Sequence, residues 1–458
     1  MILDGVSAML REAGCLRRAR YGIAVALVAS AGAFAPTSAS ELRTDLRALT
    51  QLRRGDQSRD FEAPGILYGD LGLRGLPQGS SIDTYFGLAH DFARNEGLFT
   101  DLYSASLNVP DAIQGVDFTV GRQFLAETPG GAFVADAGKV RFALGEHESL
   151  TVFGGVPRYF EPTYSTTQFS QDENIWGGSV RTTRLDNTSV SLSYLNQARE
   201  GSALRRLLSV SGATSIPSLP GLPNFYGSTS YDIDGANLDH VIVGTQVLAL
   251  PPRLSLNFES SYYKPQDQGD YINPDFERRE DAIFELFSVS HLLQFRGGLR
   301  YAFTSAVSAF ADYSYQRYER LEGDNENGHI GSAGIDWLPH GDGLEVVRLE
   351  YYTADSGGGL MNGGRARYES RVYERLMFYI GGGGVYYEKS TNQNDFALNT
   401  ITGLAYSLLP GLVCEVNFEA NSNPRFDNDF RVGMWLTYNG RHRITPPELP
   451  AADTGEQT

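Results

Sequence analysis

The sequence contains little cysteine, few histidines and no basic excess. Cys15 and Cys414 are the two cysteines of the 458 residues, and we expect the first to be removed by processing. A single remaining thiol cannot form an internal disulfide. The seven histidines are scattered without the spacing of a metal-binding pair. With 55 acidic against 38 basic residues, the formal net charge is -17, so we expect no nucleic-acid partner.

Catalytic and cofactor motifs are also missing. The sequence has no Gly-x-Ser-x-Gly element, P-loop or dinucleotide fingerprint. We interpret the pair Asp239-His240 as two ordinary residues at the end of a strand and not as a catalytic pair. The acidic stretch from Asp232 to Asp239 loosely resembles a calcium loop, but no bidentate Glu follows at the required distance. We therefore predict no enzyme, no cofactor and no metal site.

The N-terminal segment has the layout of a secretory signal peptide. Arg11, Arg17, Arg18 and Arg20 precede an uncharged run from Gly22 to Phe34, which is too short to span a bilayer as a helix. Small residues at 37–39 suggest cleavage after Ala39. We therefore predict that residues 1–39 are removed and that the chain is exported.

The rest of the chain is uniform and has the period-2 pattern of β-strands. Between Phe430 and Tyr438, apolar residues alternate with Arg431, Gly433 and Thr437, which gives a strand with one apolar face. One such strand alone could also be the edge strand of a soluble sandwich. About twenty such segments follow one another, however, and most are close to the 9–11 residues that a tilted strand needs to cross a bilayer. No later segment is apolar enough for a transmembrane helix.

The connections between these segments are alternately short and long, as in a barrel with short turns at one end and loops at the other. The longest predicted loop is Arg199–Gly235, which contains a possible short helix at Ala203–Val210 and three prolines. It could constrict or plug a lumen, or lie on the surface as a mobile loop. We predict an all-β fold, a transmembrane antiparallel up-and-down β-barrel of about 20 strands, with 18 or 16 also possible. It would span residues 40–438 and be followed by a periplasmic tail at 439–458.

The last predicted strand resembles the C-terminal targeting signal of Gram-negative outer-membrane barrels. Arg431, Gly433, Leu436 and Tyr438 occupy the polar, glycine, apolar and aromatic places of that signal. The resemblance implies an outer-membrane location and recognition of these four residues by the barrel-assembly machinery. In that family the signal usually ends the chain, whereas here about twenty residues follow Tyr438.

Charged residues fall on the face opposite the apolar one, and this face would line the interior. The pore-lining candidates are Glu259, Arg296, Arg300, Arg367, Arg371, Arg375, Glu415, Glu419 and Arg431. Because a sheet buried on both sides could not hold so many charges, we expect a wet interior. Each residue could contact a solute or pair with an opposite charge to brace the wall.

Gly121-Arg122-Gln123 resembles the Gly-Arg-Gln of several porin and alginate-export barrels. Arg122 shares its parity with the apolar residues Phe118, Val120 and Phe124. Either a bulge at Gly121 resets the register, or Arg122 lies at the membrane rim. The resemblance covers one strand and the hairpin after it.

These observations predict a porin-like channel for passive diffusion of small hydrophilic solutes. One alternative, implied by the alginate-export resemblance, is an export channel for an anionic polysaccharide, which needs a continuous basic track. Another is a plugged or structural barrel, or a rare membrane hydrolase. Besides outer-membrane lipids, the expected partners are the assembly machinery and the solutes.

Overall fold

The computed structural model describes most of the predicted barrel. The described residues are 40–54, 61–93, 98–129, 131–159, 168–169, 173–249, 253–264, 289–320, 326–340, 344–356, 359–388, 394–423 and 427–444. The predicted signal peptide and residues 445–458 lie outside them. The described part contains no helix long and apolar enough to cross a membrane.

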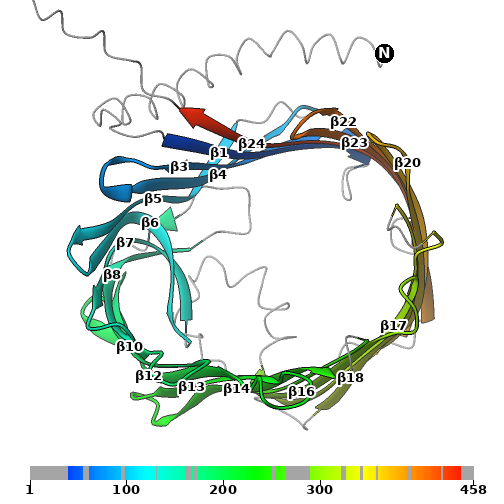
Figure 1. Ribbon diagram of the computed structural model, residues 1–458. Helices are drawn as coiled ribbons and strands as arrows, with labels where there is room; N and C mark the ends of the chain where they lie inside the picture. The colour runs from blue at the N-terminus through cyan, green and yellow to red at the C-terminus, as the bar shows by residue number, and fades with distance from the viewer. Residues whose placement is uncertain are drawn as a thin grey trace, which may run out of the picture.

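The fold is a closed antiparallel β-barrel, as the sequence predicted. Of the 24 strands in the described residues, β2 and β9 have two residues each, and the other 22 each pair with the next of these longer strands along the chain. The ring closes where β1 pairs with β24, with Ser40 opposite Ile444 and Leu52 opposite Val432. Figure 1 shows these two strands side by side, one blue and one red. Because the first and last strands pair, the sheet has no open edge along this seam.

The strands of the first half alternate in direction and are joined mostly by short connections. They are β1 (Ser40–Arg54), β2 (Phe61–Glu62), β3 (Pro64–Arg74), β4 (Ser81–Asp91), β5 (Phe99–Ile113), β6 (Val116–Thr128), β7 (Gly131–Ala143), β8 (Glu148–Tyr159), β9 (Gln168–Phe169), β10 (Glu173–Thr182), β11 (Thr188–Arg199) and β12 (Ser202–Ser215). A 3₁₀ turn, η1 (Pro77–Gly79), joins β3 to β4.

The strands of the second half complete the ring. They are β13 (Asn224–Asp232), β14 (Asn237–Ala249), β15 (Leu254–Tyr263), β16 (Val289–Ala302), β17 (Val307–Arg320), β18 (Glu326–Trp337), β19 (Glu345–Ser356), β20 (Gly359–Tyr373), β21 (Leu376–Glu388), β22 (Asn394–Leu409), β23 (Leu412–Asn423) and β24 (Asp427–Ile444). We call the end of the barrel that holds Ser40 and Ile444 the termini end, and the opposite one the far end.

The prediction of a loop at Arg199–Gly235 is wrong. Two strands form there instead, which accounts for the difference between the predicted 20 strands and the observed 22. This segment forms β12 and β13, so Ala203–Val210 is strand and not helix. Leu207 and Ser209 are buried on one face while Leu208 and Val210 are exposed on the other, which is the period of a strand. The three prolines that suggested a loop lie in or beside the turn at 216–223, where they interrupt no ladder. This segment is therefore part of the barrel wall and does not form a plug.

The last strand is longer than the sequence indicated. β24 continues past Tyr438 to Ile444, and residues 439–444 pair with residues 40–45 of β1. Part of the predicted tail thus belongs to the barrel, because the complementary strand β1 begins at Ser40 and offers these residues a partner.

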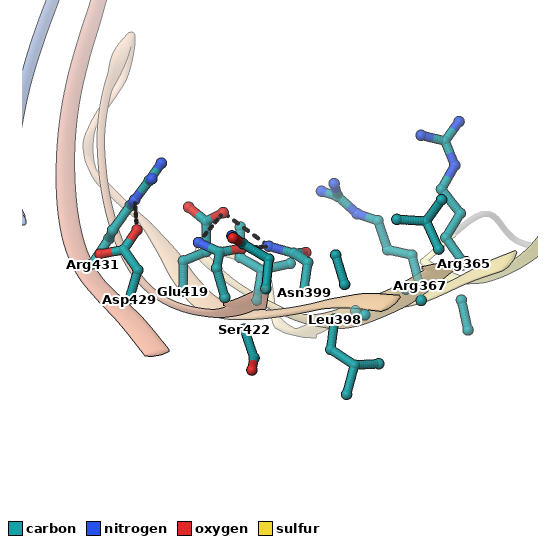
Figure 2. A pocket seen from close by; sticks show the side chains of 18 of the residues that line it. Arg365, Arg367, Leu398, Asn399, Glu419, Ser422, Asp429 and Arg431 are labelled. Atoms are coloured by element: carbon teal, nitrogen blue, oxygen red, sulfur yellow. Dashed lines mark hydrogen bonds and ion pairs between the residues drawn. The ribbon is translucent and has the colours of Figure 1, made fainter. Parts of the chain in front are cut away.

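The two faces of the wall differ in polarity. On β23 and β24, Val416, Phe418 and Phe430 are 46%, 43% and 58% exposed and share one face. Charged residues of the same strands, such as Glu419 and Arg431, lie on the other face. Figure 2 shows the same division, with Leu398 on the outer side of the wall and Arg365, Arg367 and Arg431 on the inner side. An apolar outer face and a polar inner face are the arrangement of a transmembrane barrel.

A second feature of the wall is a lobe folded around a small apolar core. Leu125 of β6, Ile175 of β10, Leu195 of β11 and Leu207 of β12 are at most 1% exposed and pack together, although their strands are not all neighbours. Ala135, Ala137 and Phe153 of β7 and β8 complete the cluster. In Figure 1 the cyan strands β6 and β7 turn inward here. The six strands β6, β7, β8, β10, β11 and β12 therefore form a lobe with an apolar core within the ring.

Candidate functional site

The predicted pore-lining residues lie mainly on the inner face. Glu259 is opposite Arg296, and Arg431 is opposite Glu419, so the members of each pair share one face of the sheet. Arg300, Arg367, Arg371 and Glu415 also occupy inner-face positions of their strands. Arg375 instead lies in the two-residue turn between β20 and β21, at the termini end.

The first charged cluster of the inner wall is centred on Asp336 of β18. Arg348 donates from Nε to Oδ1 at 2.6 Å, and Nη2 of Arg300 lies 3.3 Å from Oδ2. The guanidinium groups of Arg300 and Arg348 lie over the ring of Phe310, 5.6 and 5.9 Å from its centroid, respectively. Charge-assisted hydrogen bonds hold the shared carboxylate between the two guanidinium groups, and cation-π contacts hold these groups over the aromatic ring. The cluster joins β16 to β19.

Next to this cluster the wall forms a recess of about 590 Å³. Arg365 and Arg367 project into it from β20 (Figure 2). Its floor is the run Gly381–Gly384 of β21, in which Gly383 and Gly381 stand directly opposite the two arginines. Since glycine has no side chain, nothing on this stretch of strand projects toward the lumen. The two guanidinium groups therefore have free space beside them.

Each of these arginines has a carboxylate neighbour. Arg365 donates to Glu350 at 2.7 Å, and Nε of Arg367 lies 2.5 Å from Oε1 of Glu369. The side chains of Arg365 and Arg367 nevertheless remain 61% and 49% exposed. The pairs thus brace the wall without removing the arginines from the lumen.

The opposite side of the recess is acidic and amide-rich. Asn399 and Asn421 each donate from Nδ2 to Oε1 of Glu419, at 2.9 and 3.1 Å. Arg431 donates to Asp429 at 2.6 Å, as the dashed line in Figure 2 marks. The recess therefore offers guanidinium donors on one side and carboxylate and amide acceptors on the other.

Four aromatic residues of the inner face each lie directly across the ladder from a glycine, and the sequence analysis did not predict this arrangement. The pairs are Tyr226–Gly244, Phe310–Gly334, Tyr352–Gly363 and Tyr379–Gly403. A Cβ on any of these glycines would overlap the ring that covers it. Each ring therefore lies flat on the wall, which keeps bulky side chains out of the lumen. Once the strand register is known, aromatic residues opposite glycines reveal the pattern.

Tyr379 shows how such a ring supports the charged residues. Its hydroxyl donates to Glu415 at 2.5 Å, and the guanidinium of Arg367 lies 4.9 Å from the ring centroid. The ring is only 3% exposed. Tyr379 thus orients Glu415 and Arg367, two residues that the sequence predicted as pore-lining.

The sequence identified the pair Asp239-His240 but not the polar network around it on β12–β14. Arg205 donates to the buried Asp239, which contacts His240 (Oδ2 to Nδ1, 3.2 Å), and Nε2 of His240 lies 3.4 Å from Oγ of Ser228. In the turn at 233–236, Arg206 donates to Asp234 at 2.8 Å and lowers the pKa of that carboxyl. The described residues contain no group of three or more potential metal ligands, including around the acidic stretch from Asp232 to Asp239.

Arg122 keeps the parity of the apolar residues around it, because the register runs unbroken from Gly121 to Arg122 on both sides of β6. No bulge resets it. Arg122 donates to Asp136 of β7 at 2.8 Å and to the carbonyl oxygen of Leu102 of β5 at 2.7 Å. Arg158 of β8 donates to the same Asp136. An outer-face arginine is thus accommodated by a shared carboxylate and a backbone acceptor.

The sequence matches no protein-family model and no curated protein. Its fold resembles crystal structures of bacterial proteins. One is the Pseudomonas aeruginosa protein OccK3 (OpdO), with a TM-score of 0.46, 10% identity and coverage of 88% of this chain and 96% of that one. Another is the outer membrane protein OpdK of the same organism, with a TM-score of 0.45, 11% identity and coverage of 88% and 99%.

A third structure is Acinetobacter baumannii OccAB4, with a TM-score of 0.44, 8% identity and coverage of 88% and 99%. At this level the likeness says nothing of what passes through or binds to this chain.

Proposed function

We propose that this protein is an outer-membrane channel for passive diffusion of small hydrophilic solutes, with both termini in the periplasm. The observation that carries the proposal is the polarity of the wall, which is apolar outside and lined inside by exposed charged residues such as Arg365 and Arg367. Charges at this density need water around them. Diffusion through a wet lumen requires no catalytic step and no cofactor.

The dimensions of the barrel are consistent with this role. Twenty-two strands, spaced by about 4.8 Å and tilted by about 40°, give a circumference of roughly 140 Å. Barrels of about 16–18 strands already leave an aqueous channel, so a ring of this size has room for both the lobe and a lumen. The described residues form the wall, the lobe and the connections between strands, and none of them forms a separate plug domain.

The charge distribution favours small solutes over an anionic polymer. Export of a polyanion needs a continuous track of basic groups, whereas Arg300, Arg348, Arg365, Arg367 and Arg431 each lie within 3.4 Å of a carboxylate oxygen. These carboxylates interrupt the positive potential along the wall. Mixed pairs suit solutes that carry both donors and acceptors, for which the recess offers both.

Liposome swelling tests the proposal. Proteoliposomes should swell in arabinose, glucose and sucrose at rates that fall with molecular size, and should not swell in a large dextran. A barrel that is plugged or structural gives no swelling in any sugar. Rapid uptake of an anionic oligosaccharide, together with slow uptake of neutral sugars of the same size, would instead support the export alternative.

We further propose that Arg431, Gly433, Leu436 and Tyr438 are read by the barrel-assembly machinery. Tyr438 lies on the outer face near the termini end, and its hydroxyl is 2.6 Å from Nε2 of His442. Tyr438→Ala should reduce the fraction of protein assembled in the outer membrane several-fold, measured by heat-modifiable mobility of membrane fractions.

Tyr406→Ala is the matched control, because Tyr406 is also an outer-face tyrosine near the same end. It should assemble normally. Equal assembly of both variants would remove the targeting role and leave the barrel assignment intact.

A further inference from the structure

The recess beside Arg365 and Arg367 has a regular layout, because the strand register sets its side chains in two rows across the wall. From β20 to β22 the rows are Arg365, Gly383 and Asn399, and Arg367, Gly381 and Ile401. Neighbouring strands are about 4.8 Å apart, so the side chains of β20 and β22 leave a gap about 10 Å wide over the two glycines. A gap of this width can hold one six-membered ring with its substituents.

Side chains also limit the gap along β21. Val385 follows Gly383 on the inner face toward the far end, and the ring of Tyr379 precedes Gly381 toward the termini end. Val385 and Ile401 add apolar groups to the lining of the recess. Its volume of about 590 Å³ lies within the usual range of ligand pockets. The recess therefore combines a backbone floor, polar sides and apolar contacts.

The floor of the recess requires glycine at the two positions that face inward, Gly381 and Gly383. A Cβ on Gly381 would lie 3.1 Å from a backbone oxygen of β20, and a longer side chain there would fill the gap. Gly364 of β20 instead faces outward, opposite Tyr351, and a Cβ there would make an ordinary contact, 3.5 Å from the carbonyl oxygen of Glu350. Substitutions of the same kind can therefore be compared inside and outside the recess.

The arginines beside the gap keep part of their hydrogen-bonding capacity. Nε and Nη2 of Arg365 donate to Glu350 at 2.9 and 2.7 Å, which uses two of the five N–H groups of this guanidinium. Arg367 is held by Glu369 and by the ring of Tyr379. Both arginine side chains remain exposed to the lumen, so a hydroxyl group can bind either guanidinium without breaking its ion pair.

The charges around the recess cancel. Among the described residues, five guanidinium groups line it or share a carboxylate with one that does, namely Arg300, Arg348, Arg365, Arg367 and Arg431. Five carboxylates line it or pair with these groups, namely Asp336, Glu350, Glu369, Glu419 and Asp429. A ligand with a net charge finds no net counter-charge here, whereas a neutral ligand with several hydroxyl groups can use donors and acceptors together.

We propose that the recess is a binding subsite for a neutral sugar, with one pyranose ring lying over Gly381 and Gly383. The inference rests on the proposed diffusion function and names a class of solute for it. Hydroxyl groups at one edge of the ring accept from Arg365 and Arg367, and those at the other edge bind the amide of Asn399 (Figure 2). The C–H groups of the ring contact the apolar side chains of the recess. A sugar acid or an amino sugar adds a charge to a balanced site, so both bind more weakly.

Three hexoses that differ in charge test the subsite at equilibrium. Glucose, glucuronate and protonated glucosamine are titrated into the folded protein in detergent, and binding is followed by saturation-transfer NMR. We expect saturable binding of glucose, and binding of both charged sugars that is about tenfold weaker. Absence of saturable glucose binding, or equal binding of all three sugars, would overturn the proposal.

Two variants, each checked for folding by heat-modifiable mobility, locate the bound sugar. Gly381→Val should abolish glucose binding, because its side chain occupies the floor. Gly364→Val, the matched control on the outer face, should bind glucose as the unchanged protein does. If both variants lost binding equally, or if neither did, the sugar would not lie on this floor and the subsite would be overturned.

The double substitution Arg365→Gln/Arg367→Gln keeps the floor and removes two positive charges. It should bind glucosamine more tightly than glucose, because Glu350 and Glu369 are then unbalanced. An unchanged preference for glucose would overturn the argument from balanced charge. None of these measurements depends on solute flux. Failure of the subsite therefore leaves liposome swelling intact, whereas failure of the channel abolishes swelling and leaves the binding.

Discussion

Val416→Arg is expected to destabilise the barrel by about 2–4 kcal/mol, the cost of an arginine on the lipid face near the bilayer midplane. Val416 lies near the middle of β23 and is 46% exposed on the outer face. A guanidinium at this position has only hydrocarbon around it and must distort the bilayer or reach for a headgroup. Urea unfolding of the protein in lipid vesicles, followed by tryptophan fluorescence, measures the loss.

The neighbouring substitution Asn417→Arg is the matched control. Asn417 lies on the inner face between Glu415 and Glu419, opposite Gly433. An arginine there enters water beside two carboxylates, so its stability should change by less than about 1 kcal/mol. If the two variants lost equal stability, the assignment of outer and inner faces on this strand would be wrong.

Reversal of both charges in Arg365→Glu/Arg367→Glu is expected to shift ion selectivity strongly toward cations. The double substitution changes the local charge by four units. At about 10 Å in water each unit is worth about 0.4 kcal/mol without screening, and about 0.15 kcal/mol at about 0.1 M salt, where the Debye length is about 10 Å. The change acts with opposite sign on cations and anions, so the permeability ratio of cation to anion should rise roughly tenfold at about 0.1 M salt. The reversal potential in a salt gradient measures this ratio, and the effect should shrink as the salt concentration rises.

Arg184→Glu controls for the change in overall charge. Arg184 lies in the turn after β10 at the termini end, and its side chain is 74% exposed. Its reversal should leave the selectivity nearly unchanged. The neutral pair Arg365→Gln/Arg367→Gln should give about half of the shift. If Arg184→Glu had the same effect as the double reversal, the recess would not govern ion passage.

Most of the wall could be predicted from the sequence, because strand periodicity is local information. Alternation such as that of Phe430, Val432 and Met434 with Arg431 and Gly433 identifies both the strand and its outer face. The pore-lining candidates followed from the same parity, and eight of the nine lie at inner-face positions of the strands.

The errors arose where local signals conflict. In β12 the leucines and arginines between Leu204 and Leu208 fit a helix as well as a strand, and the prolines from Pro217 onward suggested a loop. The decisive evidence is pairing: Leu207 packs in the lobe core, and Arg205 finds Asp239 on β14. Such partners are far away in the sequence, so parity alone could not reveal them.

The lobe, and the end of the ladder between β5 and β6 at Ala105 and Arg122 beside it, are further examples. Leu125 and Ile175 each have the pattern of an ordinary inner-face residue, and nothing local indicates that they meet. Gly121 was noticed for its neighbour Arg122, but its φ depends on how closely β5 approaches. Contacts between strands that are not neighbours in the sheet determine the course of the wall here.

Single-channel recording in a planar bilayer tests the central claim, a water-filled lumen inside a membrane-spanning barrel, most directly. The folded protein should produce discrete conductance steps that rise with salt concentration, and the double reversal Arg365→Glu/Arg367→Glu should change their selectivity. If protein that is folded by heat-modifiable mobility produced no steps, the lumen would be blocked, and the channel function proposed for this barrel would be contradicted.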